Sequence, residues 1–126
     1  MRIKYPKHKY NANLPTEREE QKILIQYLQA RRIPHYAVPN GGSRNPIEAK
    51  NLKAEGVNAG VPDICIPVPN KKYHGLYIEM KRQRGGRVSE KQKEWIDKLN
   101  HLGYLAVVCR GFDEAREVVE SYMKEI

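Results

Sequence analysis

A continuous apolar run between two amphipathic segments constrains the fold of this chain more than any other feature. The run is Tyr-Leu-Ala-Val-Val-Cys at residues 104–109, and such a run is typical of a strand buried on both faces of a sheet. Residues 89–102 before it and residues 112–124 after it place apolar side chains at helical spacing. A strand between two helices predicts an α/β fold, in which helices flank a mixed sheet.

The remainder of the chain supplies further elements of the same kinds. Thr16 followed by Glu19 forms a capping box that predicts the start of a helix. The expected elements before the apolar run are a helix to about residue 31, a strand at 35–38, a short helix at 47–55, and strands at 61–66 and 76–81. The predicted order is αβ(α)ββαβα, in one domain at residues 16–126 that follows an extended basic arm at residues 1–15.

The net charge of the chain indicates which kind of partner to expect. The 126 residues carry a net charge of +8, which favours nucleic acid as the ligand. No apolar run approaches the roughly 20 residues that span a bilayer, so no membrane partner is expected. Cys65 and Cys109 each lie within an apolar run and are expected as reduced core thiols. This usage favours a reducing, cytoplasmic location.

The predicted strand Leu-Tyr-Ile-Glu-Met-Lys at residues 76–81 places polar chemistry on one sheet face. Side chains alternate along a strand, so Leu76, Ile78 and Met80 share the core face. Glu79 and Lys81 then share the opposite face, roughly 6–7 Å apart along the strand. From this segment alone, the two could equally form an ordinary surface ion pair.

Asp63 changes this interpretation. If strands 61–66 and 76–81 pair as a hairpin, Asp63 can lie on the same face as Glu79. Two neighbouring acids repel one another, and a divalent cation removes that repulsion. Mg²⁺ prefers carboxylate oxygens and can activate a water molecule for attack on a phosphodiester, and Lys81 beside it could stabilise the transition state. Asp63, Glu79 and Lys81 are therefore the candidate catalytic residues.

Several motifs together resemble one nuclease family. Pro62-Asp63 followed by Glu79-Met80-Lys81 is similar to the PD-(D/E)xK signature. Its context, GVNAGVPD, LYIEMKR, GGRVSEKQ and LGYLAVVCRGFDEA, with TEREEQ and PNGGSR upstream, resembles the virus-type replication-repair nuclease (VRR-NUC) family over residues 16 to about 122. The resemblance implies a restriction-endonuclease-like fold and a free-standing member of phage or bacterial type.

The resemblance also implies metal ligands. Asp63, Glu79 and the backbone carbonyl of Met80 would hold Mg²⁺ or Mn²⁺ beside Lys81. A further acid is expected on the first helix. Glu20 is preferred because it shares the face of Ile23 and Leu24, and Glu17, one turn earlier, is the second candidate.

Gln92 has two interpretations that the sequence leaves open. Ser89 and Gln92 satisfy a capping box, which is a sufficient structural reason for both residues. Gln92 also lies on the helical stripe that faces the sheet, and the resemblance implies a catalytic place beside the lysine. Asn40 and Arg44 fit both a turn and a loop that contacts substrate. The residues expected to contact phosphates without reading bases are Lys71, Lys72, Arg82, Arg84 and Arg87.

The expected function is metal-dependent hydrolysis of DNA. The resemblance implies a homodimer that acts on branched DNA such as four-way (Holliday) junctions, in replication or repair. The alternatives are a non-specific or flap nuclease that uses the same site, and a nucleic-acid-binding module without catalysis.

Overall fold

The computed structural model describes residues 13–40 and 45–126, so most of the expected basic arm, and Arg44, lie outside the described residues. The described helices and strands are, in chain order, α2 (Glu17–Ala30), β1 (Tyr36–Ala37), α3 (Pro46–Ala54), β2 (Ile64–Ile66), β3 (Leu76–Lys81), α4 (Glu90–His101), β4 (Leu105–Arg110) and α5 (Phe112–Met123).

The four strands form one mixed sheet in the order β1-β2-β3-β4. β2 pairs antiparallel with β1 and with β3, and Ile64 lies opposite Ile78 in the β2–β3 hairpin. β3 and β4 are parallel, and parallel neighbours need a crossover connection, which α4 provides. The expected mixed sheet flanked by helices is confirmed.

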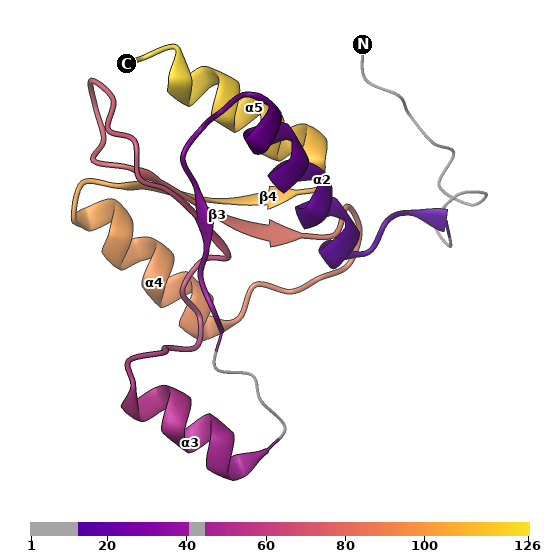
Figure 1. Cartoon of the computed structure of the whole chain (residues 1–126), viewed down its shortest axis with the longest axis vertical. Coiled ribbons are helices and arrows are strands. Elements are labelled where there is room, and N and C mark those ends of the chain that lie inside the picture. The colour runs from indigo at the N-terminus through magenta and orange to yellow at the C-terminus, as the bar shows by residue number, and fades with distance from the viewer. Residues whose placement is uncertain (1–12, 41–44) are drawn as a thin grey trace.

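Helices cover the sheet unevenly. Figure 1 shows α2 and α5 side by side on one face, α4 on the other, and α3 standing apart from the sheet. Both capping boxes expected from the sequence are present, at Thr16–Glu19 and at Ser89–Gln92. α3 has its own cap, because the Asn45 side chain accepts hydrogen bonds from the backbone N–H groups of Ile47 and Glu48.

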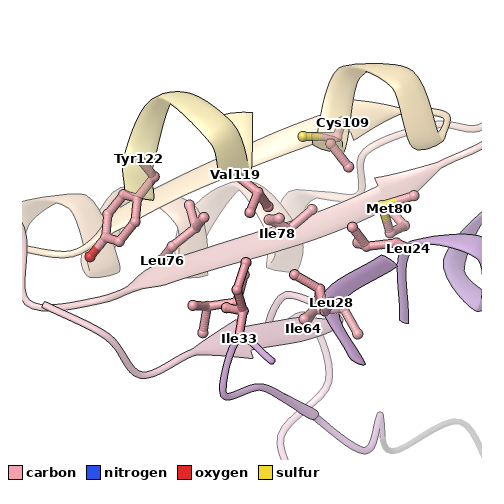
Figure 2. Packing of buried hydrophobic residues seen from close by; sticks show 12 residues of the cluster. Leu24, Leu28, Ile33, Ile64, Leu76, Ile78, Met80, Cys109, Val119 and Tyr122 are labelled. Carbon is pink, nitrogen blue, oxygen red and sulfur yellow. The ribbon is translucent and has the colours of Figure 1, made fainter. Parts of the chain in front are cut away.

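The core lies between the sheet and the α2–α5 pair (Figure 2). Its members are fully or almost fully buried and come from every layer of that side: Leu24, Leu28, Ile64, Ile66, Leu76, Ile78, Met80, Ala115, Val119 and Tyr122. The alternation predicted for β3 is confirmed, since Leu76, Ile78 and Met80 all belong to this core. Cys65 and Cys109 are buried free thiols, as expected.

β2 is shorter than predicted. Pro62 and Asp63, expected within a strand at residues 61–66, precede β2, which begins at Ile64. Proline has no N–H group to donate to a neighbouring strand, so regular pairing does not extend to it. Asp63 therefore lies at the point where the hairpin opens, next to the end of β3.

Candidate active site

Glu79 and Lys81, near the carboxyl end of β3, form a buried ion pair. Lys81 Nζ lies 3.4 Å from Glu79 Oε2, and Lys81 and Glu79 are only 6% and 1% exposed. An ordinary surface pair would be largely solvated, so that alternative from the sequence is excluded. Burying these two charges costs solvation free energy that a single ion pair does not fully recover, and such pairs in clefts are therefore candidates for function.

Asp63 is fixed against the same strand. Its Oδ2 accepts a hydrogen bond of 2.8 Å from the backbone N–H of Met80, so its carboxylate lies beside Glu79. Burial raises the pKa of the Asp63 carboxyl, while the hydrogen bond from Met80 acts in the opposite direction. The predicted approach of Asp63 to Glu79 across the hairpin is thus present in the structure.

The third acid of the site is Glu17, from the first turn of α2. Carboxylate oxygens of Glu17, Asp63 and Glu79 all lie within 4.8 Å of one another. The structure therefore places Glu17, and not the Glu20 preferred from the sequence, beside Asp63 and Glu79. Glu20 does face inward, as its spacing from Leu24 predicted, but it faces the interior between α2 and α5.

Glu20 has a different set of partners. Its Oε1 accepts a hydrogen bond of 3.1 Å from the backbone N–H of Phe112, and its Oε2 accepts one of 2.8 Å from Gln83 Nε2. Phe112 is the first residue of α5, whose N-cap Gly111 has no side chain to cap the helix. Glu20 thus caps α5 from a neighbouring helix, and both of its oxygens are already used.

Gln92 makes contacts that fit both interpretations from the sequence. Its Oε1 accepts a hydrogen bond from Ser89 N at 2.9 Å, which completes the capping box of α4. Its Nε2 donates to Glu79 Oε2 at 3.0 Å. One amide therefore fixes the start of α4 to the carboxylate on β3, and the two interpretations are compatible.

The second oxygen of Glu79 suits a cation. Glu79 Oε1 is buried and has no hydrogen-bond partner among the described residues, although buried carboxylate oxygens are normally satisfied. Burial and the neighbouring charge of Asp63 raise the pKa of Glu79 to about 8, with Lys81 acting in the opposite direction. Three carboxylates against one ammonium leave an excess of negative charge, which a divalent cation would neutralise.

The distances in the cluster also fit such an ion. Mg²⁺ binds oxygen at about 2.1 Å, so two of its ligands are at most about 4 Å apart. A spread of up to 4.8 Å needs only small side-chain adjustments to reach that geometry. The residues present therefore fit Mg²⁺ or Mn²⁺.

The backbone of Met80 points toward the same place. A strand residue directs its N–H and C=O to the same side, and the N–H of Met80 bonds to Asp63. Continuing the register of Ile64 with Ile78 would set Pro62 opposite Met80. Proline has no N–H group to donate, so the Met80 carbonyl lacks this strand partner and can act as a ligand.

The described residues that are expected to bind DNA lie in three places. Asn40 lines a cavity of about 1030 Å³ together with Glu17 and Asp63. Three exposed arginines follow Lys81 directly, in the segment at residues 82–88: Arg82, Arg84 and Arg87. Lys71 and Lys72 lie in the hairpin loop that precedes β3, and about 10 Å of that strand separates this loop from Glu79.

Two residues that support the site were missed by the sequence analysis. Gln83 holds Glu20, as described above, and Arg110 Nη1 donates to the carbonyl oxygens of Gly85 at 2.6 Å and Gly86 at 3.1 Å. Arg110 thereby anchors the segment that carries the three arginines. Arg110 could be found only from the register of the sheet, because it lies opposite Lys81 in the parallel β3–β4 pair.

A mixed sheet flanked by helices, with three carboxylates and a lysine at one end, fits a nuclease-type domain. The model of the VRR-NUC domain family matches residues 16–113. A solved structure described as a VRR_NUC domain protein is 30% identical over 90% of this chain and 92% of its own, with a TM-score of 0.78. No curated protein matches the chain.

This chain belongs to the VRR-NUC domain family. Its function is therefore of the nuclease type, a hydrolase that acts on DNA, and nuclease domains of this kind typically use divalent metals. Within residues 13–40 and 45–126, no helix has the length and apolar character needed to cross a membrane.

Proposed function

We propose that this chain is a DNA endonuclease that hydrolyses phosphodiester bonds with Mg²⁺ or Mn²⁺. Glu17, Asp63, Glu79 and the carbonyl of Met80 would hold the ion. The observation that carries the proposal is the buried, unpartnered Oε1 of Glu79 inside a cluster of three carboxylates. An ion pair between Glu79 and Lys81 with only a structural role would not require the neighbouring carboxylates or a buried Oε1 without a hydrogen-bond partner.

The side chains have separate tasks in this mechanism. Mg²⁺ held by these acids would supply polarisation of the phosphoryl group and a lowered pKa for a bound water molecule. Lys81, which lies 3.4 Å from Glu79, would donate hydrogen bonds to the attacking water or to a phosphoryl oxygen as negative charge develops. Gln92 holds Glu79 Oε2, which keeps the carboxylate oriented and leaves Oε1 for the ion.

Basic side chains would bind the DNA backbone around the site. Arg82, Arg84 and Arg87 lie closest to Lys81 in the chain and would contact the phosphates on either side of the scissile bond. Asn40, which lines the cavity beside Glu17 and Asp63, and Arg44 would also contact the DNA strand. Lys71 and Lys72, at the other end of β3, would reach only a substrate that extends across the sheet.

Branched DNA fits this distribution of charge. A four-way junction presents phosphates in more than one direction, so it can contact basic residues at both ends of β3. Resolving a junction takes two cuts, and a two-fold symmetric homodimer would supply two sites. The proposal is therefore a homodimeric, structure-selective endonuclease acting in replication or repair, in the cytoplasm of a bacterial cell.

A cleavage assay with a substrate panel tests the proposal. Four-way junctions, flaps, linear duplex and single strands are incubated with Mg²⁺, Mn²⁺ or EDTA, and the mass of the protein is measured by sedimentation. We expect paired cuts near the branch point that require the metal and are absent in Asp63→Asn. Equal rates on all substrates would support the non-specific or flap nuclease, and binding without cleavage under every condition would support the silent binding module.

A further inference from the structure

We infer that the cleft between α3 and α4 binds an unpaired nucleotide of the DNA substrate, which stacks on Trp95 and places phosphates against lysines. The cleft has a volume of about 550 Å³, within the range of about 300–1,000 Å³ of small-ligand pockets. The inference rests on the proposed function, since the nucleotide belongs to the strand that the acidic cluster would cut.

Three separate segments build this cleft. α3 provides Ala49, Lys50 and Lys53, the segment at residues 57–59 provides the floor, and α4 provides Lys91, Glu94 and Trp95. The floor is held close to α4, since a Cβ atom on Gly60 would lie 2.7 Å from the backbone carbon of Lys91. Gly60 also has a φ of +94°, a conformation that favours glycine. The segment that ends at Gly60 therefore packs tightly against the start of α4.

The charge of the cleft suits a nucleotide phosphate. Lys50, Lys53 and Lys91 are exposed, and among the described residues none of them takes part in an ion pair. Glu94 is the acid among the lining residues, so the lining has a net positive charge. Exposed ammonium groups around a recess attract phosphates. When they bind, the nucleic acid releases its condensed counterions, so the affinity depends on the salt concentration.

Trp95 gives the cleft its selectivity for a base. The indole is half-buried, and Lys98 Nζ lies 5.3 Å from its ring centroid, which adds a further cation beside the aromatic surface. Aromatic side chains surrounded by basic residues are the usual platform for the bases of single strands. Bases inside a duplex are already stacked on their neighbours, so a paired nucleotide would not be accessible to the indole.

The cleft adjoins the acidic cluster through two short connections. Lys91 precedes Gln92, whose amide lies 3.0 Å from Glu79 Oε2, and Ala59 precedes Asp63 by four residues. A strand whose nucleotide enters the cleft can therefore continue to the acids within a few nucleotides. α3 makes no contribution to the core, in agreement with a role in substrate binding.

Intrinsic fluorescence tests the inference directly, because Trp95 is the sole tryptophan of the chain. A short oligothymidylate is titrated into the whole protein in EDTA, which prevents metal-dependent cleavage, and a long blunt duplex and inorganic polyphosphate are titrated in parallel. We expect the single strand to quench the emission most strongly. Binding without quenching, equal quenching by polyphosphate, or equally tight quenching by the duplex would each overturn the inference.

Substitutions separate stacking from charge. Trp95→Ala should weaken binding of the oligothymidylate about 5- to 150-fold, the equivalent of about 1–3 kcal/mol of base stacking. Trp95→Phe keeps an aromatic ring and should retain part of this affinity. Lys50→Gln and Lys53→Gln should each lower the salt dependence by about 0.7 in the logarithmic slope. Lys124→Gln, exposed beyond the end of α5, is the matched control and should leave the slope unchanged.

These experiments distinguish a failure of the inference from a failure of the nuclease proposal. If the cleft binds no nucleotide but metal-dependent cleavage occurs, only the inference fails. If the cleft binds the single strand and no cleavage is found with any metal, the proposed function fails and the cleft remains a binding site. Wild-type affinity and slope in Lys50→Gln and Lys53→Gln, with both proteins folded by circular dichroism, would exclude these lysines and with them the inference.

Discussion

Asp63→Asn should make the metal-free protein more stable while removing its catalysis. The substitution is conservative in shape, because the side-chain carbonyl oxygen of asparagine can still accept the hydrogen bond from Met80 N. What disappears is one negative charge beside Glu79. The site is expected to be destabilising without its ion, so removing that charge should increase the free energy of unfolding in EDTA.

The size of the effect follows from the geometry. Two unit charges at 4.8 Å, the distance within which the acids of the cluster lie, repel by about 3 kcal/mol at an effective dielectric constant of about 20. Asp63 also interacts favourably with Lys81, and that attraction is lost in the variant. A net gain of about 1–2 kcal/mol is therefore expected when Glu79 is ionised, since the two effects partly cancel.

The gain must depend on pH with a definite sign. The pKa of Glu79 rises from 4.5 to about 8 on folding, so the native state holds its proton more tightly than the unfolded chain. The contribution of the protonated Glu79 carboxyl to the free energy of unfolding is fully present below pH 4.5 and is lost as the pH rises through about 8. The Asp63→Asn substitution removes a charge that raises this folded-state pKa, so the variant should lose less stability over the same window.

Urea denaturation followed by circular dichroism measures the effect. Wild type and Asp63→Asn are compared at pH 6 and pH 9 in EDTA, and again with excess Mg²⁺. The variant should be the more stable protein at pH 9, and Mg²⁺ should stabilise the wild type alone. Asp97→Asn on the exposed side of α4 is the matched control and should change neither result. A variant less stable than wild type at pH 9 in EDTA would refute this reasoning.

Three further predictions concern single residues of the site. Lys81→Ala should keep Mg²⁺ binding but slow cleavage at least about 100-fold in single-turnover assays, the usual effect of losing one transition-state stabiliser; loss of metal binding with unchanged catalysis per bound ion would contradict it. Glu17→Gln should weaken Mg²⁺ binding in calorimetry with little change in stability, whereas Glu20→Gln should lower the free energy of unfolding by about 1–3 kcal/mol. Combining Glu20→Gln with Gln83→Glu should recover that stability, because the hydrogen-bond donor and acceptor exchange places. If Glu20→Gln weakened Mg²⁺ binding and Glu17→Gln did not, the metal site would be assigned to Glu20. Gln92→Glu preserves the acceptor that caps α4 at Ser89 but adds an anion 3.0 Å from Glu79, which should raise the pKa of Glu79. The pH profile of cleavage should therefore move to higher pH while the helix content stays constant. An unchanged profile would show that Gln92 only caps α4.

Local patterns predicted much of the site. Alternation along residues 76–81 determines which face carries Glu79 and Lys81, whatever the rest of the fold does. Pro62 marks the place where strand pairing stops, and Asp63 follows it directly. The two capping boxes are relationships between residues three positions apart, so the sequence alone predicts them.

The sequence preferred Glu20 as the helix acid, whereas the structure places Glu17 beside Asp63 and Glu79, for a reason that is not local. The spacing of Glu20 from Leu24 correctly predicted burial, but burial alone does not say against which element. Gly111 leaves the first N–H group of α5 without a cap, and that group lies 92 residues away in the chain. Only the packing of α2 on α5 brings Glu20 to this N–H group and turns Glu17 toward the acids.

The sequence by itself determined the elements of this protein and the faces of its strands, because periodicity, caps and turn residues act over a few positions. The tertiary structure alone decided which distant groups meet: Glu17 with Asp63 and Glu79, Gln92 with Glu79, and Trp95 with the lysines of α3. The physical reason is that a helix presents several faces of similar polarity. Which of them meets the sheet is fixed by long-range packing and hydrogen bonding, and no short stretch of sequence encodes it.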